Sequence, residues 1–201
     1  DYDADGVPAA VILSQFFKRI GFLNFSVYIP DRQTEGHGLS GEAIHKFAAD
    51  KNSLIITVDC GIANVAEVAL ARELGLGVII TDHHLPPPIL PAAEAIIDPK
   101  QTGGTYPSPW LCGAGVAFKL VQALVQSWDK TADPAAKVGV NWQKWLLDLV
   151  AIATITDMVP LRDENWTLAH FGLKVLRQTP RVGLQRLCEL IRLDRATTTE
   201  D

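Results

Sequence analysis

The chain has 201 residues, of which 48% are hydrophobic and 20% charged, so its composition excludes a disordered protein and allows one large core or two small ones. Its net charge of -5 excludes a globally basic nucleic-acid-binding protein, although acidic metal ligands would contribute to that charge in a metal-dependent nuclease. Three widely spaced cysteines, no membrane-length apolar run and no signal-peptide pattern predict a soluble, cytoplasmic α/β protein.

The chain opens with acids at alternate positions, Asp1, Asp3 and Asp5, followed by a glycine and a proline. Proline is favoured in the first turn of a helix, so we expect a helix over residues 9–20. One acid would be enough to cap that helix, whereas three favour cation ligands over capping alone. Because such a loop normally follows an apolar strand, we also expect the chain to be a fragment of a longer protein.

The next segment predicts a strand, a polar loop and a second helix. Residues 25–29 are apolar enough for a strand that ends at a proline. In the glycine-rich loop that follows, His37 is either a substrate contact or a solvated histidine. Ser40 is a suitable N-cap for a helix that ends near Asp50.

The middle of the chain predicts a β–α–β unit. Residues 53–58 form an apolar, β-branched run typical of a strand covered on both faces, and an amphipathic helix is expected over residues 64–74. A second strand is expected over residues 78–81, and a short third one over 93–97. This order favours a parallel sheet.

Polar residues follow the first two of these strands. Asp59 ends the first, and Asp82, His83 and His84 end the second. Parallel strands have their carboxyl ends at the same edge of the sheet, where open α/β folds bind ligands. We therefore expect these side chains to meet in one site.

The remainder of the chain is predicted to be helical. A helix over residues 111–128 begins near Gly113 and Gly115, which either let the backbone approach a phosphate or allow close helix packing. A buried helix over residues 142–155 leads to Asp157, which is either metal-bound or paired with Arg162. Helices over residues 165–178 and 181–193 are interpreted as structural packing.

The candidate residues together suggest a chemistry. Carboxylates mixed with imidazoles, without a cysteine pair, suit Mn²⁺ or Mg²⁺. The number of candidates exceeds the needs of one ion and predicts two, which activate water and stabilise the entering and leaving oxygens of a phosphoryl displacement. The reaction class is hydrolysis of a phosphodiester or a phosphoanhydride.

Four ordered motifs resemble the DHH phosphoesterase superfamily: residues 1–6, 58–61, 82–84 and 156–161. Segments 28–39 and 112–120 resemble its single-strand-specific exonucleases. The resemblance implies an α/β parallel-sheet domain with helices on both faces, followed by a helical segment. Residues 1–110 would form the core and residues 111–201 the helical part of the same catalytic domain, with a second catalytic domain absent from this chain.

The resemblance also implies a Mn²⁺- or Mg²⁺-dependent 5′-to-3′ exonuclease acting on single-stranded DNA in repair and recombination. Its metal ligands would be Asp3, Asp5, Asp59, His83 and Asp157, with Asp59 as the bridge. His84 would contact or protonate the scissile phosphate, and Asp82 and Asp1 would orient the ligands. His37, Gly113 and Gly115 are the candidate substrate contacts.

The chain departs from the family at Trp166, where an arginine is common, so one phosphate-facing charge is lost. We expect the chain alone to fold and bind metal but to cleave poorly. The alternatives are a DHH hydrolase of short oligonucleotides, cyclic dinucleotides or pyrophosphate, and a non-catalytic scaffold that binds DNA or a replication partner.

Overall fold

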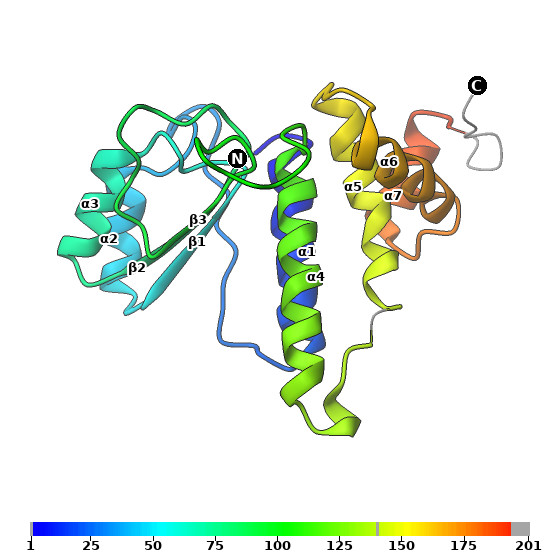
Figure 1. Ribbon diagram of the computed structural model, residues 1–201, viewed down its shortest axis with the longest axis horizontal. Coiled ribbons are helices and arrows are strands. Elements are labelled where there is room, and N and C mark those ends of the chain that lie inside the picture. The colour runs from blue at the N-terminus through cyan, green and yellow to red at the C-terminus, as the bar shows by residue number, and fades with distance from the viewer. Residues whose placement is uncertain (1, 140, 194–201) are drawn as a thin grey trace.

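The computed structural model describes residues 2–139 and 141–193 as a parallel sheet with helices on both faces, followed by a helical segment. Figure 1 shows α2 and α3 on one side of the sheet, α1 and α4 on the other, and α5, α6 and α7 beyond them. The predicted fold class is confirmed.

The elements follow in the order α1 (Gly6–Arg19), α2 (Gly41–Ala49), β1 (Leu54–Val58), α3 (Val65–Glu73), β2 (Gly77–Thr81), β3 (Ala95–Ile97), α4 (Gly113–Thr131), two 3₁₀ turns η1 (Pro134–Ala136) and η2 (Gln143–Leu146), α5 (Leu147–Thr156), α6 (Asp163–Leu176) and α7 (Val182–Leu190). The strands lie in the order β1-β2-β3. None of the described helices has both the length and the apolar content needed to cross a bilayer.

The sheet has two apolar faces because successive side chains of a strand point to opposite sides. In β1, Ile56 and Val58 pack against the core formed with α1 and α4, whereas Ile55 packs against the core under α2 and α3. In β3, Ile97 packs against the core formed with α1 and α4, and Ile96 packs against the core under α2 and α3. Apolar side chains are therefore needed on both faces of the strands.

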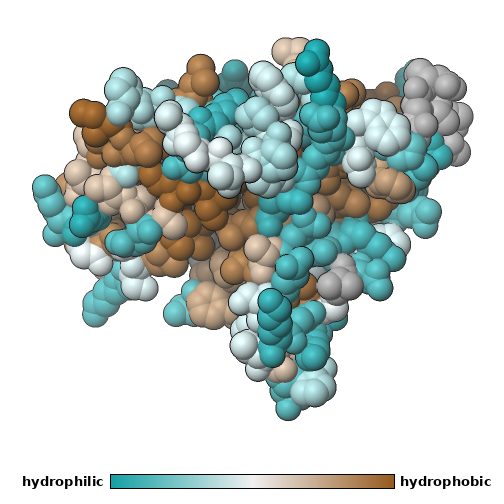
Figure 2. Space-filling model, in the orientation of Figure 1, coloured by the Kyte–Doolittle hydropathy of each residue, from teal (hydrophilic) through white to brown (hydrophobic). Residues whose placement is uncertain are grey.

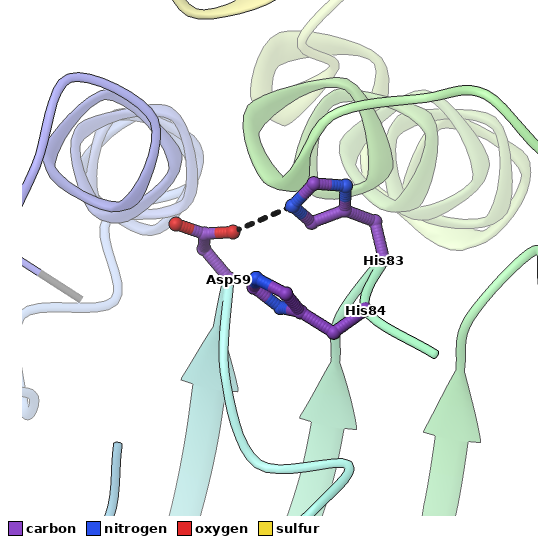
Figure 3. A group of neighbouring side chains, drawn as sticks. All are labelled: Asp59, His83 and His84. Atoms are coloured by element: carbon purple, nitrogen blue, oxygen red, sulfur yellow. Dashed lines mark ion pairs between the residues drawn. The ribbon is translucent and has the colours of Figure 1, made fainter. Parts of the chain in front are cut away.

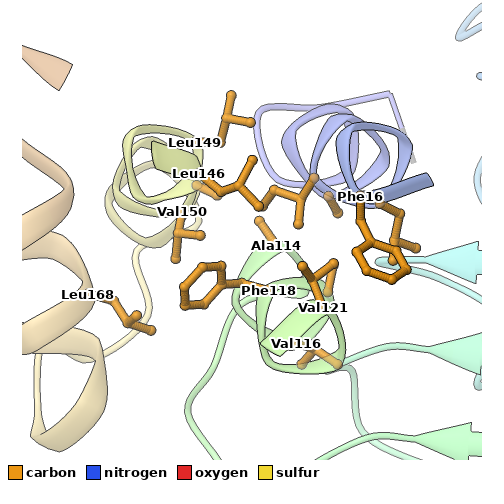
Figure 4. Close-up of a cluster of buried hydrophobic side chains, with 14 of the residues drawn as sticks. Phe16, Ala114, Val116, Phe118, Val121, Leu146, Leu149, Val150 and Leu168 are labelled. Carbon is orange, nitrogen blue, oxygen red and sulfur yellow. The ribbon is translucent and has the colours of Figure 1, made fainter. Parts of the chain in front are cut away.

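The larger core joins the α/β part to the helical part. Phe16 of α1, Phe118 of α4, Val150 of α5 and Leu168 of α6 belong to one buried cluster. The Phe118 ring extends from α4 toward Val150 and Leu168 (Figure 4). The outer surface is different: a column of hydrophilic side chains runs down the middle of the molecule, where α4 lies in Figure 1 (Figure 2). This amphipathic helix thus connects the sheet to α5 and α6.

The strand predicted over residues 25–29 is wrong. The segment is not part of the sheet, whose described strands are β1, β2 and β3 alone. Val27, Tyr28 and Ile29 are exposed, and β1 has its hydrogen-bonded neighbour, β2, on one side only. A β-prone sequence becomes a strand only where a partner satisfies its backbone groups.

The helix predicted from residue 142 begins with a 3₁₀ turn instead, and α5 starts at Leu147. Two competing hydrogen bonds explain the difference. The guanidinium of Arg181 donates to the carbonyl oxygen of Trp145 at 3.1 Å, and the N–H of Leu149 donates to the buried Asp148 carboxylate at 2.9 Å. The α-helical bond between residues 149 and 145 is thereby replaced.

Helices α5 and α6 pack closely at Gly172, and this contact gives a stability prediction. A methyl group there would lie 2.2 Å from the carbonyl oxygen of Leu147 and 2.4 Å from Cβ of Ala151. Since neither atom can rotate away, Gly172→Ala should lower the free energy of unfolding by about 1–3 kcal/mol or more. The matched control is Gly183→Ala in α7, where the added methyl group meets nothing within 4 Å. Urea unfolding of both variants checks this, and equal midpoints would contradict it.

Candidate metal centre

Two of the predicted residues, Asp59 and His83, lie side by side at the carboxyl ends of β1 and β2. Asp59 directly follows β1, and its N–H continues the ladder by donating to the carbonyl oxygen of Thr81 at 2.9 Å. Its φ of 59° is left-handed, a conformation that few non-glycine residues adopt and that clusters at functional sites. Figure 3 shows the Asp59 carboxylate and the His83 ring pointing toward each other above the strand ends.

His83 lies among three carboxylates from separate parts of the chain. Its Nε2 is 3.1 Å from Asp59 Oδ1, 3.6 Å from Asp5 Oδ2 and 3.8 Å from Asp157 Oδ2. The residues form two overlapping three-residue groups with ligand-like spacing that share His83, one with Asp59 and His84 and one with Asp5 and Asp157. The packing of α1 on the sheet, and of α5 on α1 and α4, thus completes the set.

The electrostatics of this cluster are those of crowded, buried carboxylates. Burial, and then the neighbouring charge of Asp59, raise the pKa of Asp5 to about 7. Burial alone would lower the pKa of His83, but its contact with Asp59 and the charges of Asp5 and Asp59 raise it overall. Asp59 Oδ1 is buried and accepts no conventional hydrogen bond within the described chain. A divalent cation fits this donor set because it would satisfy that oxygen and offset the repulsion.

Asp82 positions both histidines and is itself fully buried. Its Oδ1 accepts from the N–H of His83 at 2.7 Å and from Nδ1 of His84 at 2.7 Å, while Oδ2 accepts from the N–H of Ile62 at 2.9 Å. The hydrogen bond from His84 and these backbone donors lower the pKa of Asp82 against the effect of burial. In turn, Asp82 raises the pKa of His84.

The first turn of α4 is built around Asp5. Both oxygens of this carboxylate accept backbone hydrogen bonds, from the N–H of Gly113 and of Ala114 at 2.6 Å each. A methyl group on Gly113 would lie 2.5 Å from both Cβ and Oδ1 of Asp59, so only glycine fits there. The N–H of Gly115 donates to the sulfur of Cys112. The N–H groups of both glycines are thus hydrogen-bonded inside the chain, and their role as phosphate contacts stays a prediction.

Two predicted residues, Asp3 and His37, lie apart from the cluster around His83, and a third is not among the described residues. Asp3 lies just before α1, and its Oδ1 accepts from the N–H groups of Asp5 and Gly6 at 2.8 and 2.9 Å. His37 is exposed, and its Nε2 lies 2.7 Å from the hydroxyl of Tyr2. Asp1 lies outside the described residues. Roles for Asp3 as a metal ligand and His37 as a substrate contact stay predictions.

One buried acid was missed from the sequence. Asp98 follows β3 in the same way that Asp59 follows β1, and its Oδ2 has no hydrogen-bond partner in the described chain. Burial raises the pKa of Asp98. The charge of Asp82 raises this pKa further, whereas the charge of His83 lowers it. In the sequence, Asp98 could have been found as a site residue from the repeated pattern of an apolar strand followed by an aspartate.

The alternative pairing of Asp157 with Arg162 does not form among the described residues, where Asp157 lies beside His83 instead.

Comparisons with known proteins point to one family. The family model "DHH family, N-terminal domain" matches residues 1–154. A Bacillus subtilis protein named single-stranded-DNA-specific exonuclease RecJ is 47% identical over 190 residues, which cover 94% of this chain and 22% of that protein. Its Escherichia coli namesake is 39% identical over 96% of this chain and 34% of its own length.

Two solved structures have the same fold. A crystal structure of exonuclease RecJ bound to manganese superposes with a TM-score of 0.81 at 33% identity, covering 97% of this chain and 47% of that one. The structure of RecJ in complex with Mn²⁺ from Thermus thermophilus gives 0.77 at 31% identity, covering 97% and 26%. The chain thus spans only part of the proteins that it matches.

Proposed function

Because the chain belongs to the DHH family, we propose that its centre hydrolyses phosphodiester bonds of single-stranded DNA with the help of divalent cations, as a 5′-to-3′ exonuclease in repair and recombination. The observation that carries the proposal is His83, whose Nε2 lies within 3.8 Å of three carboxylates from α5, the β1 end and the loop before α1. The high identity to proteins named RecJ supports the substrate. A cytoplasmic location stays a prediction.

We propose that Asp5, Asp59, His83 and Asp157 hold the cations, with Asp59 shared between two ions and Asp3 contributing from the start of α1. Mn²⁺ fits the mixed oxygen and nitrogen donors best, and Mn²⁺ is what the two similar solved structures contain. When bound, the ions supply an activated water and charge stabilisation at the phosphate. The chain supplies the fixed geometry, because three of these side chains are almost fully buried.

His84 is the proposed contact to the scissile phosphate. Its side chain is 56% exposed, so substrate reaches it, whereas His83 is buried. The Asp82 carboxylate accepts a hydrogen bond from Nδ1–H of His84, which leaves Nε2 to face the phosphate oxygen. Since Asp82 raises the pKa of His84, the imidazole retains a proton that it can donate there. Asp82, and Asp1 by resemblance, would orient these groups rather than react.

The first test is metal binding, because the chain spans only part of its relatives and we expect slow turnover from it alone. Calorimetric titration of the chain with Mn²⁺ should yield saturable binding with about two sites. Hydrolysis is then followed on single-stranded DNA labelled at the 5′ or the 3′ end, on duplex DNA, on a cyclic dinucleotide and on pyrophosphate. Mononucleotides released from the 5′ end of single strands are expected. Preference for the small substrates, or DNA binding without any Mn²⁺ site, would contradict the proposal.

A further inference from the structure

The outer side of α6 carries cationic and aromatic residues at intervals of four: Arg162 at the N-cap, Trp166, His170 and Lys174. Residues four apart lie on the same face of a helix, so these side chains form one ridge, called here the α6 ridge. The Trp166 and His170 rings are stacked, with centroids 4.8 Å apart and planes at 21°. The ammonium of Lys174 lies 2.7 Å from Nε2 of His170.

Arg162, Trp166 and Lys174 of the ridge are exposed to solvent, and His170 is half-buried. Trp166 is 54% exposed, while Leu168 and Gly172 face inward from the same helix. Glu164 is also directed elsewhere, since its Oε1 accepts from Lys119 of α4 at 2.6 Å. Packing explains why small and apolar residues lie on the inner side of α6, but it does not explain why aromatic and cationic residues form the ridge.

The ridge is connected to the metal centre by a short exposed loop. Asp157, beside His83, is the C-cap of α5, and α6 begins at Asp163. In between, Met158 is 86% exposed with a left-handed φ of 55°, and Leu161 is 53% exposed. Apolar and aromatic side chains are therefore presented to solvent from the metal centre onward to Trp166.

We propose that the α6 ridge binds the single-stranded DNA strand beyond the scissile phosphate, with a base stacked on Trp166 and phosphates beside Arg162 and Lys174. This inference rests on the proposed function and adds a substrate path to it. Aromatic rings alternating with cations suit a single strand, because every base has a stacking face and every nucleotide a negative charge. Asp163 partly offsets the charge of Arg162, so Trp166 and Lys174 make the dominant contacts.

The test measures binding without hydrolysis. The chain is titrated, in EDTA, into a dye-labelled oligothymidylate of about 15 nucleotides, and fluorescence anisotropy is read at several salt concentrations. Trp166→Ala should weaken binding about tenfold with an unchanged salt dependence, and Trp166→Phe should restore most of the affinity. Lys174→Ala should reduce the slope of log K against log salt by about 0.7.

The matched control is Trp145→Ala. Trp145 is 43% exposed and has a cation, the ammonium of Lys144, over its ring. It lies in η2, before the start of α5, whereas Asp157 lies at the end of α5. Its loss should leave DNA binding within twofold of the parent. No binding by the parent chain, or equal affinities for Trp166→Ala and Trp145→Ala, would overturn the ridge proposal. Mn²⁺-dependent hydrolysis by the parent is scored separately, so either proposal can fail while the other stands.

Discussion

Replacing Asp59 with asparagine is expected to weaken Mn²⁺ binding by at least about 100-fold and to abolish measurable hydrolysis. The Asp59 carboxylate is buried, lies 3.1 Å from His83 Nε2, and has one oxygen without a conventional hydrogen bond in the described chain. An amide of the same shape keeps the packing but removes the charge that attracts a cation. Mn²⁺ titration by electron paramagnetic resonance measures the loss directly, whatever the turnover rate of the chain.

The same variant should keep its fold, which separates loss of the site from unfolding. The charge of Asp59 contributes to raising the pKa of Asp5 from 3.8 to about 7, so the metal-free folded chain binds a proton that the unfolded chain releases at lower pH. Asp5 therefore costs stability increasingly as the pH rises from 3.8 to about 7. Removing the Asp59 charge reduces that cost and offsets the lost contact with His83.

The control for charge is Asp50→Asn, which removes one negative charge from the exposed C-cap of α2. We expect Mn²⁺ binding to be unchanged in this variant. Parent-like Mn²⁺ affinity in Asp59→Asn, or equal losses in both variants, would show that the cluster is not the metal site.

Gly113→Ala is expected to impair the centre nearly as severely, although glycine has no ligand atom in its side chain. The new methyl group would lie 2.5 Å from Cβ of Asp59, an atom fixed by the backbone. Either Asp59 moves, or the first turn of α4 moves and breaks its two 2.6 Å hydrogen bonds to Asp5. In both cases a proposed ligand is displaced, and we expect Mn²⁺ affinity to fall about 10- to 100-fold.

Gly115→Ala is the matched control for this variant. It lies in the same turn of α4 and gains the same helix propensity, but its added methyl group meets Leu111 at an ordinary 3.4 Å. Calorimetry with Mn²⁺ should therefore distinguish the two variants clearly. If both bind Mn²⁺ like the parent, close approach of α4 to Asp59 does not matter for the site.

These two glycines illustrate where sequence reasoning stopped. The pattern of residues 111–116 leaves close packing and phosphate binding open, and only the structure reveals the close contact between Gly113 and Asp59. Likewise, the helix over residues 165–178 was interpreted as structural packing, and its exposed ridge was not anticipated. The strand expected over residues 25–29 failed for the opposite reason, since its sequence is suitable but the described chain offers it no partner.

The sequence by itself determined the order of most helices and strands, the parallel sheet, and the meeting of Asp59 with His83 at one sheet edge. It could do so because hydrophobic periodicity is local and the position at a strand end follows directly from it. The family resemblance grouped Asp5 and Asp157 with His83, but only the tertiary structure showed how they approach it. It alone decided that Asp5 accepts hydrogen bonds from the first turn of α4 and that Trp166 faces solvent. Those arrangements depend on how α1, α4, α5 and α6 pack together, and contacts between residues about 100 positions apart leave no periodic pattern in a single sequence.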